Sequence, residues 1–403
     1  MLELKTVEEA RKILGKIKLM GAETIEVTKS LDRFVATDII SSEDLPPFDK
    51  SMMDGYAVKA EDTFGASEEN PVSLSLAGEV RIGEVPKKEV KKGEAIKINT
   101  GAMMPKGANS VEMLEYTEIK GRGVELQKAL TPSENIAKRG EDIKKEEVLL
   151  ATGHRIRAQD IGALSGLGIT EIKVFKRPKV AIIPTGDELI EPKRKPESGQ
   201  IRDMNTYSLS AQIRKCGGEP VPFEIIKDNP RILKEKIKEA LSKADMVLIS
   251  GGSSVGTYDL TLKVMSSLTQ GKVLTQGVAI KPGKPTIIAK VREKIVFGLP
   301  GNPASVMIVF RKIVEPTILA MMNAKARIRI INARLARTVT SSTGREEYIR
   351  VRLEEQEGRL IAIPLHRGTA NIVSLVKADG LLKIPRLSEG AEKGQMVEVE
   401  LWD

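Results

Sequence analysis

The sequence has few of the residues on which several kinds of site depend. A single cysteine, Cys216, excludes an internal disulfide framework and suits a reducing compartment. Two histidines, His154 and His366, argue against a histidine-based triad or a histidine-rich metal centre. We interpret all three residues as structural. No run of about 18 apolar residues occurs, and the first residues lack the apolar core of a signal peptide, so we expect a cytoplasmic protein with no membrane association.

Aromatic residues make up only 3% of the chain, which bears on nucleic acid as a ligand. The balance of 64 Lys and Arg against 55 Asp and Glu gives a net charge of +9, so nucleic acid has to be considered. The basic residues, however, form no long run, and the sequence contains neither a zinc-finger nor an aromatic-stacking pattern. We therefore expect no nucleic-acid partner and favour a small anionic ligand.

The length of 403 residues exceeds one compact core, and changes of pattern along the chain predict several domains. Thr6 and Glu9 are spaced as a capping box, and a helical period returns after the glycine-rich region. Residues 1–45 and 140–176 are therefore expected to form one discontinuous helical and mixed domain, whose second part packs onto the first helix. Alternation and frequent glycines between these parts predict a β-rich inserted domain over residues 46–139.

Alternating strand and helix patterns predict a doubly wound α/β domain over residues 177–323. Asn205 is expected to cap one helix, and Asn229 with Pro230 at the first helical position is expected to begin the next. Alternating strands separated by turns predict a C-terminal β domain over residues 324–403. The predicted fold class is thus α/β multidomain, with a mixed N-terminal domain, a β-rich insert and a C-terminal β domain around the α/β domain.

Polar loops follow the predicted parallel strands of the α/β domain, where such sheets bind ligands. Small residues in these loops leave backbone N–H groups free to face an anion. Lys281 and Lys284 lie on a turn stiffened by two prolines, which would hold both cations in place before a ligand arrives. The loops contain Thr185, Gly186, Asp228, the segment Ser250–Gly256, Asp259 and the segment Pro300–Pro303.

Carboxylates occur on the same predicted edge of the sheet. Glu188, Asp228 and Asp259 offer hard oxygen ligands that suit Mg²⁺ bound to a phosphoanhydride. Taken alone, a carboxylate of this kind is more often a helix cap or one half of a surface ion pair, but several on one edge favour a binding site. The loops lack the lysine of a Walker motif, and no Gly-x-Gly-x-x-Gly follows a strand, so ATP-driven and hydride-transfer chemistry are excluded.

Two features of the inserted region allow more than one interpretation. Asp49 and Asp54 lie in the proline-containing loop 45–57 and need a partner, which could be a lysine, a metal or backbone N–H groups; a simple turn is the alternative. Thr100 lies at the end of a predicted strand beside Gly101, where its hydroxyl could cap the backbone or touch a ligand. The residues alone leave both questions open.

Seven motifs occur along the chain in a fixed order. They are Pro47–Ala57, Thr100–Ala102, Arg139–Asp142, Pro184–Leu189, Ser250–Gly256 with Asp259, Ala279–Pro285 and Leu299–Pro303. This combination resembles the molybdopterin molybdenumtransferases, which include the bacterial MoeA proteins and the carboxyl-terminal domain of gephyrin. The resemblance covers nearly the whole chain. It implies a molybdopterin-binding-like α/β domain and an elongated homodimer, whose active cleft lies between the α/β domain of one subunit and the β insert of its mate.

The resemblance also implies a reaction. Molybdate, or tungstate, is inserted into adenylylated molybdopterin in the presence of Mg²⁺, and AMP is released. The upstream donor would be a molybdopterin adenylyltransferase. Two alternatives are that the chain is itself the adenylyltransferase, or that it is a non-catalytic pterin-binding scaffold. The sequence does not separate molybdenum from tungsten, because the two oxyanions have the same charge and nearly the same size.

Position by position, the resemblance assigns roles to individual residues. The wall contributed by the partner subunit would consist of Asp54, Thr100 and Asp142. The magnesium or phosphoanhydride site would consist of Glu188, Asp228 and Asp259. The oxyanion or pyrophosphate would be neutralised by Lys281 and Lys284. Arg345 and Ser374 would be added from the C-terminal domain. The other substrate-binding candidates are Thr185, Gly186, Ser250, Gly251, Gly252, Ser254, Gly256, Pro300, Gly301, Asn302 and Pro303.

Overall fold

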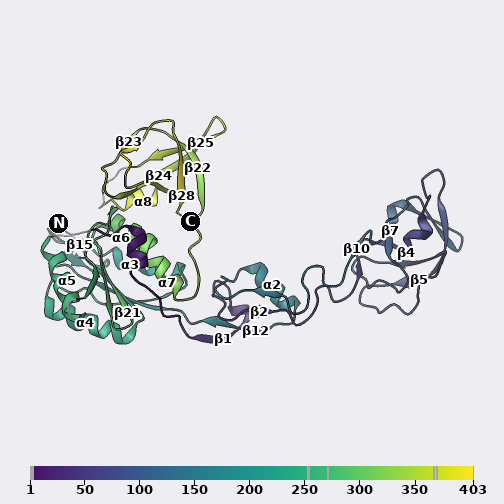
Figure 1. Ribbon diagram of the computed structural model, residues 1–403, viewed down its shortest axis with the longest axis horizontal. Helices are drawn as coiled ribbons and strands as arrows, with labels where there is room; N and C mark the ends of the chain where they lie inside the picture. The colour runs from purple at the N-terminus through teal and green to yellow at the C-terminus, as the bar shows by residue number, and fades with distance from the viewer. Residues whose placement is uncertain (1–3, 252–254, 270–271, 366–367, 369–370, 403) are drawn as a thin grey trace.

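The structure is a computed structural model that describes residues 4–251, 255–269, 272–365, 368 and 371–402. The molecule is elongated (Figure 1). A β-rich lobe lies at one end, an α/β unit with a second β sheet lies at the other, and a small mixed unit joins them. This arrangement confirms the predicted fold class, while the exact domain boundaries stay predictions.

The α/β unit is built on a six-stranded sheet whose strands are buried on both faces. All five residues of β17 (Met246–Ser250) are buried, as expected for a central parallel strand that reads as one apolar run. The first four strands in the sheet order are parallel, the fifth is antiparallel to them, and the sixth, antiparallel to the fifth, runs in the direction of the first four. The order is β16 (Glu219–Pro222), β13 (Lys179–Pro184), β17, β21 (Lys294–Leu299), β20 (Ile287–Val291) and β18 (Val273–Thr275).

Helices cover both faces of this sheet, which makes the unit doubly wound. Leu233 and Ile237 of α4 (Pro230–Lys243) pack with α5 (Val255–Leu268) on one face. The predicted start of α4 is confirmed, because the Asn229 side chain accepts from the N–H groups of Arg231 and Ile232. The other face is covered by α3 (Asn205–Lys215), α6 (Pro303–Val309), the π-helical turn η4 (Phe310–Val314) and α7 (Glu315–Ala320).

The first helix, α1 (Val7–Lys12), belongs to this second face. Its predicted capping box is present, since Thr6 and Glu9 bond each other's backbone N–H groups at 3.1 and 2.8 Å. Val7 and Ala10 join the core of the α/β unit, and the Arg11 Nε donates to the carbonyl of Lys312 at 2.6 Å. The expectation that residues 140–176 pack onto this helix is therefore wrong. The apolar face of α1 is short, and the sequence gives no sign of its distant partner.

The small mixed unit is assembled from two separate parts of the chain. Strand β1 (Ala22–Glu26) pairs with β12 (Glu171–Phe175), and β2 (Ile39–Ile40) pairs with β11 (Val148–Leu150). The 3₁₀ turn η1 (Val27–Lys29) and α2 (Ala158–Gly166) complete it. Nε2 of His154 lies 2.7 Å from Oδ2 of Asp160, and the thiol of Cys216 is buried. These observations confirm the interpretation of both residues as structural. His366 lies outside the described residues.

The β-rich lobe contains a six-stranded sheet with cores on both faces. Its strand order is β7 (Ser110–Met113), β4 (Gly55–Val58), β6 (Glu94–Ile98), β5 (Val72–Val80), β9 (Gly123–Leu126) and β8 (Thr117–Lys120). Two 3₁₀ turns and a short strand pair lie beside it: η2 (Ala60–Thr63), η3 (Leu114–Tyr116), and β3 (Lys50–Ser51) with β10 (Ile136–Ala137).

The C-terminal sheet includes one strand that the sequence assigned to the α/β domain. This strand, β19 (Ile280–Lys281), pairs in parallel with β24 (Glu346–Gln356). The order continues with β25 (Arg359–Pro364), β22 (Ile330–Leu335), β28 (Met396–Leu401) and β26 (Gly380–Ile384), and β24 also pairs with β26. Smaller elements are β14 (Leu189–Ile190), β15 (Ile201–Arg202), β23 (Val339–Thr340), β27 (Gly390–Ala391) and α8 (Val373–Val376).

The helices of the described residues are short. None of them combines the length and the apolar character that crossing a membrane requires.

Candidate functional site

The candidate site lies where the parallel strands of the α/β sheet end. Pro184, Ser250 and Leu299 are in register across β13, β17 and β21. The residues that follow these strands therefore lie side by side at the carboxyl edge of the sheet, as the sequence predicted. We call this edge the rim. It is formed by Thr185, Gly186, Ser250, Gly251, Pro300, Gly301, Asn302 and Pro303.

Thr185 connects two rim segments. It is buried, its backbone N donates to the carbonyl of Ser250 at 2.9 Å, and its hydroxyl donates to Oδ1 of Asp228 at 2.7 Å. The backbone N of Asp228 donates in turn to Oδ1 of Asp187 at 3.3 Å. A buried hydroxyl in this position fixes the orientation of the Asp228 carboxylate. Thr185 thus holds another candidate residue in place.

The rim loop after β17 requires glycine. Gly251 has φ +142°, and a Cβ built there would lie 2.0 Å from the carbonyl oxygen of Thr185. No other residue fits without moving the backbone of a neighbouring loop. The hydroxyl of Ser250 is buried there without a hydrogen-bond partner in the described residues. A buried hydroxyl of this kind marks a place where a bound group could supply the missing partner.

The start of α3 is tied to the rim by Asn205. The prediction that Asn205 caps this helix is wrong: Asn205 is its first residue, and its Nδ2 donates to the carbonyl of Gly301 at 2.7 Å. The carboxylate of Asp203 bonds the N–H of Thr206 at 3.1 Å instead. Aspartate and asparagine are equally favoured as helix caps, so the sequence alone does not show whether Asp203 or Asn205 caps α3. Pro303 is the first residue of α6, and its assignment as a substrate-binding residue stays a prediction.

The three carboxylates predicted to bind Mg²⁺ occupy different elements. Glu188 is exposed in the loop after β13, Asp228 is half-buried before α4, and Asp259 is exposed on α5. Among the described residues, no group of three or more acidic, histidine or cysteine side chains is arranged to hold a metal. The magnesium assignment of these residues stays a prediction. Gly252 and Ser254 lie outside the described residues, and Gly256 falls in the first turn of α5.

The lysine turn, residues 281–284, joins the α/β unit to the C-terminal sheet. Lys281 on β19 lies 3.1 Å from Oε2 of the buried Glu347 on β24. Lys284 is exposed. Gly283, with φ +123°, closes the turn, since a Cβ there would lie 2.4 Å from Cγ2 of Val309. The rigidity that the sequence attributed to two prolines therefore also comes from strand pairing and an ion pair.

The candidates of the C-terminal region differ in their surroundings. Arg345 is half-buried and directly precedes β24. Ser374 is buried on α8, where its hydroxyl donates to the carbonyl of Asn371 at 2.7 Å and its backbone N donates to Oδ1 of Asn371 at 3.1 Å. The Ser374 side chain thus takes part in local turn bonding. Its role as a ligand stays a prediction.

Two candidate residues of the β-rich lobe, Asp54 and Thr100, are in direct contact. Oδ1 of Asp54 accepts from the backbone N of Thr100 at 2.8 Å, and this hydrogen bond lowers the pKa of Asp54. Both side chains are exposed. Asp142 is exposed on the segment leading away from the lobe, where its backbone N donates to the carbonyl of Leu45 at 3.0 Å. Within one chain this lobe lies at the opposite end of the molecule from the rim (Figure 1).

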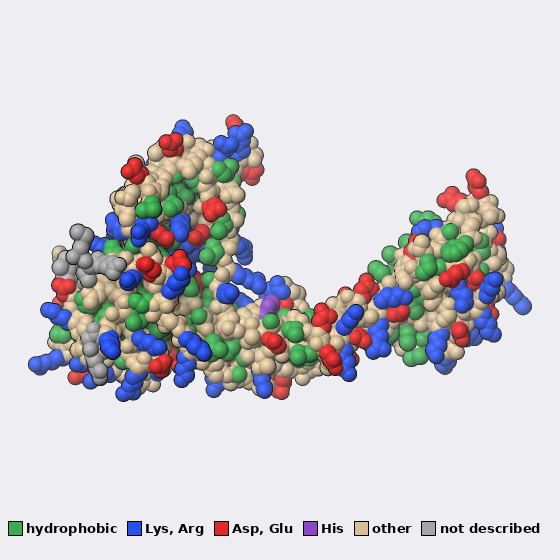
Figure 2. Space-filling view, in the orientation of Figure 1, with side chains coloured by type: hydrophobic (Ala, Val, Ile, Leu, Met, Phe, Trp, Pro, Cys, Tyr) green, Lys and Arg blue, Asp and Glu red, His purple; other side chains and the backbone are tan. Residues whose placement is uncertain are grey.

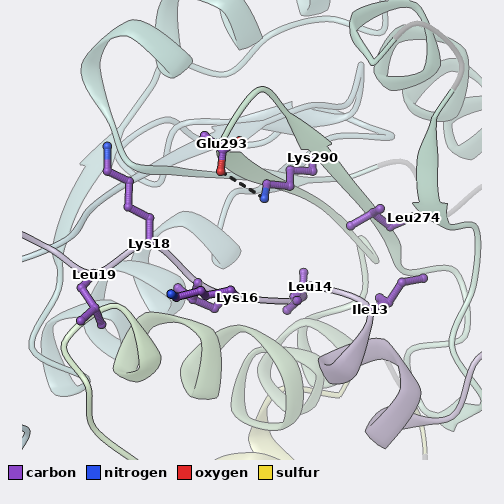
Figure 3. A pocket seen from close by; sticks show the side chains of 10 residues that line it. Ile13, Leu14, Lys16, Lys18, Leu19, Leu274, Lys290 and Glu293 are labelled. Atoms are coloured by element: carbon purple, nitrogen blue, oxygen red, sulfur yellow. Dashed lines mark ion pairs between the residues drawn. The ribbon is translucent and has the colours of Figure 1, made fainter.

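A cavity of about 670 Å³ lies elsewhere, between the residues after α1 and strands β18 and β20 (Figure 3). Lys290 and Glu293, which line it, form an ion pair at 3.3 Å. An adjoining cavity includes Asp245 and Met246, at the amino end of β17. Both cavities are therefore at the edge of the sheet opposite the rim. The surface facing the viewer in Figure 2 carries basic and acidic side chains mixed over all lobes.

The fold and the rim define a class: a multidomain protein with a doubly wound α/β domain, whose parallel strands end in glycine-containing loops, together with separate β-rich and C-terminal β units. Three family models match the chain. They are the MoeA N-terminal region (domain I and II) over residues 5–168, the probable molybdopterin binding domain over residues 181–320, and the MoeA C-terminal region (domain IV) over residues 332–402. The chain belongs to the MoeA family, so the resemblance drawn from its motifs is confirmed.

Individual relatives agree with this assignment. The molybdopterin molybdenumtransferase of Bacillus subtilis is 33% identical over 411 residues, which cover 100% of this chain and 95% of that protein. Two crystal structures of molybdopterin biosynthesis MoeA proteins from Pyrococcus horikoshii are similar over their whole length. One is 38% identical with a TM-score of 0.81 and full coverage of both chains. The other, from strain OT3, is 33% identical with a TM-score of 0.85 and covers 99% of this chain and 100% of its own.

Proposed function

We propose that this protein is a molybdopterin molybdenumtransferase. It would insert molybdate or tungstate into adenylylated molybdopterin, break the phosphoanhydride link of that substrate and release AMP. The observation that carries the proposal is the combination of the glycine rim with the lysine turn in a chain that shares its full length with a bacterial protein of that name. Fixed positive charge and backbone N–H groups at a common edge are what an oxyanion and a phosphoanhydride both require.

The rim residues of this chain would receive the phosphoanhydride. Gly251 lets the backbone approach closely, because any side chain there would collide with Thr185. Thr185 holds the Asp228 carboxylate in one orientation. The buried hydroxyl of Ser250 would donate to a phosphate oxygen, which supplies the partner that it lacks among the described residues.

The oxyanion would bind at the lysine turn. Lys281 and Lys284 offer two ammonium groups, and Arg345 adds a guanidinium from the segment that precedes β24. Pairing of β19 with β24 brings the backbone of these segments together, since the N–H of Glu346 donates to the carbonyl of Ala279 at 2.9 Å. Cations held in advance of binding lower the ordering cost when the ligand arrives.

A magnesium ion is implied by the family, and the donor chemistry of the rim fits it. Carboxylate oxygens are the ligands that Mg²⁺ prefers, and Glu188 and Asp228 supply them next to the glycine loops. One oxygen of Asp228 is held by Thr185, which leaves the other for a ligand. When bound, the ion would neutralise charge on the phosphoanhydride.

The proposal includes a homodimer with a shared site. Asp54 and Thr100 lie on the far lobe of the same chain, so a second copy is needed to bring such a pair to the rim. A molybdopterin adenylyltransferase would supply the adenylylated substrate. We further propose a cytoplasmic location, which the buried thiol of Cys216 suits.

The test is to incubate the purified protein with adenylylated molybdopterin, Mg²⁺ and either oxyanion, and to follow AMP release and metal uptake together. Asp259→Ala is expected to abolish both while the protein stays folded. Glu235→Ala, at an exposed position of α4, serves as the matched control and is expected to keep wild-type turnover. Unchanged turnover in Asp259→Ala would contradict the proposal. ATP consumption by the chain alone would favour an adenylyltransferase, and tight pterin binding without turnover would favour a scaffold.

A further inference from the structure

We propose that Glu347 is a positioning residue for the oxyanion. It holds the ammonium group of Lys281 against the C-terminal sheet, and its negative charge limits the affinity of the lysine turn for a doubly charged metal oxide. The inference rests on the proposed function, because that function is what makes Lys281 an oxyanion ligand. In this segment the sequence motifs indicate Arg345 as a site residue, and nothing in the sequence distinguishes Glu347.

Strand pairing places Glu347 beside Lys281. The two residues are direct partners in the parallel pairing of β19 with β24, one step along from Ile280 and Glu346. The strands next to β19 in sequence, β18 and β20, belong to the α/β sheet instead. The lysine turn is thus attached to the C-terminal sheet at its first residue, and the position of that sheet fixes where Lys281 lies.

The contact itself is a largely buried ion pair. The Glu347 side chain is 3% exposed and that of Lys281 is 36% exposed. Oε2 of Glu347 lies 3.1 Å from Nζ of Lys281 and also accepts from the hydroxyl of Ser341 at 2.6 Å. A carboxylate this deeply buried stays charged only when its partners remain. Glu347 therefore restrains Lys281 more firmly than a surface ion pair would.

The alternation of side chains along β24 puts Glu347 among the predicted cations. Directly opposed residues of paired strands share a face, so Glu347 lies on the same face as Lys281, and Arg345 lies in the bend that directly precedes β24. The neighbouring Glu346 has other partners: its carboxylate accepts from the hydroxyl of Tyr348 at 2.9 Å and pairs with Lys383 at 3.2 Å. Two glutamates adjacent in sequence thus have separate surroundings.

A doubly charged oxyanion bound at Lys281 would be repelled electrostatically by the Glu347 carboxylate. Both anions would contact the same ammonium group, so only a few ångströms would separate them. At an effective dielectric constant of about 20, repulsion between a carboxylate and a dianion at this distance exceeds the rotamer entropy that Lys281 regains on release. Removing the charge of Glu347 should therefore strengthen oxyanion binding, although Lys281 is then less well oriented.

The experiment is a calorimetric titration of the full-length protein with molybdate, which measures the binding affinity. Glu347→Gln keeps the shape of the side chain and removes its charge, and at least tenfold tighter binding is expected. Glu346→Gln is the matched control and is expected to bind as the wild type does. Glu347→Asp, which retains the charge, should also stay near the wild-type affinity. Thermal unfolding checks that each variant is folded.

Turnover adds a second readout that a purely structural role would not reproduce. In Glu347→Gln the half-saturating molybdate concentration is expected to fall together with kcat, because binding is tighter while Lys281 is less well positioned. Equal or weaker molybdate binding by folded Glu347→Gln would overturn the inference, as would a wild-type protein that binds no oxyanion. A wild-type protein that binds molybdate but releases no AMP would overturn the proposed function only, since the calorimetric comparison still decides the role of Glu347.

Discussion

The shape of the chain makes a specific prediction about mixed dimers. Asp54 lies on the β-rich lobe and Asp259 lies on α5 of the α/β unit, at opposite ends of the molecule (Figure 1). If the active site forms between two subunits, each site uses Asp54 of one subunit and Asp259 of the other. Homodimers of Asp54→Ala and of Asp259→Ala would both be inactive, because every site in them lacks one carboxylate.

The expected recovery follows from counting sites. In a dimer of one Asp54→Ala and one Asp259→Ala subunit, one of the two sites combines both changes and the other combines neither. Random exchange at equal concentrations makes half of all dimers mixed, so about 25% of the wild-type activity should return if the dimer has two-fold symmetry and independent sites.

The assay mixes the purified variants, proves subunit exchange by mass spectrometry of differently labelled chains, and measures AMP release. Asp259→Ala mixed with Lys284→Ala is the matched control. Both of these changes lie on the α/β side of the site, so every site in their mixed dimer carries one of them and no activity should return. An absence of recovery for Asp54→Ala with Asp259→Ala, despite complete exchange, would show that the two carboxylates do not belong to one shared site.

Three further predictions concern single contacts. Burial raises the pKa of Glu112 to about 7, so the contribution of Glu112 to the stability of the β-rich lobe should be complete below pH 4.5 and about 3 kcal/mol of it should be lost as the pH rises through 7; hydrogen exchange of the lobe measures this, and Glu112→Gln should remove this part of the pH dependence. Lys281→Met removes the ammonium group that pairs with the buried Glu347 and should cost about 3 kcal/mol in denaturant unfolding, much of it restored in Lys281→Met with Glu347→Gln. Thr185→Val removes the hydroxyl that orients Asp228 and should lower AMP release about tenfold without unfolding the protein.

Much of the fold could be predicted from local patterns. The buried run of β17, the start of α4 at Asn229 and Pro230, and the capping box at Thr6 depend on neighbouring residues alone. What failed depends on contacts distant in sequence. Packing of α1 onto the α/β unit joins residues 7–14 to the segment around Val309, and no periodicity in either stretch specifies the other.

The candidate site shows the same division. Small residues after three parallel strands predicted the rim, because parallel strands end at one edge whatever their side chains do. The hydrogen bond from Thr185 to Asp228 could not be predicted, since it depends on how a later loop folds back over β13. Glu347 was missed for a similar reason. In the sequence it is one of two adjacent glutamates, and only pairing with β19 shows which of them faces the lysine.

The pairing of β19 with β24 also bears on why the family has a C-terminal sheet. The lysine turn lies between β18 and β20 of the α/β sheet, yet its first residue is hydrogen-bonded into another sheet. A second contact fixes the two units further: Lys312 of η4 forms a buried ion pair with Glu400 of β28, and Lys312 also lies over the Tyr348 ring at 4.6 Å. Because buried pairs of this kind are costly to break, the C-terminal sheet does not shift without disturbing Lys281. In the proposed reaction, the position of this sheet relative to the rim would therefore set the distance between the oxyanion and the phosphoanhydride.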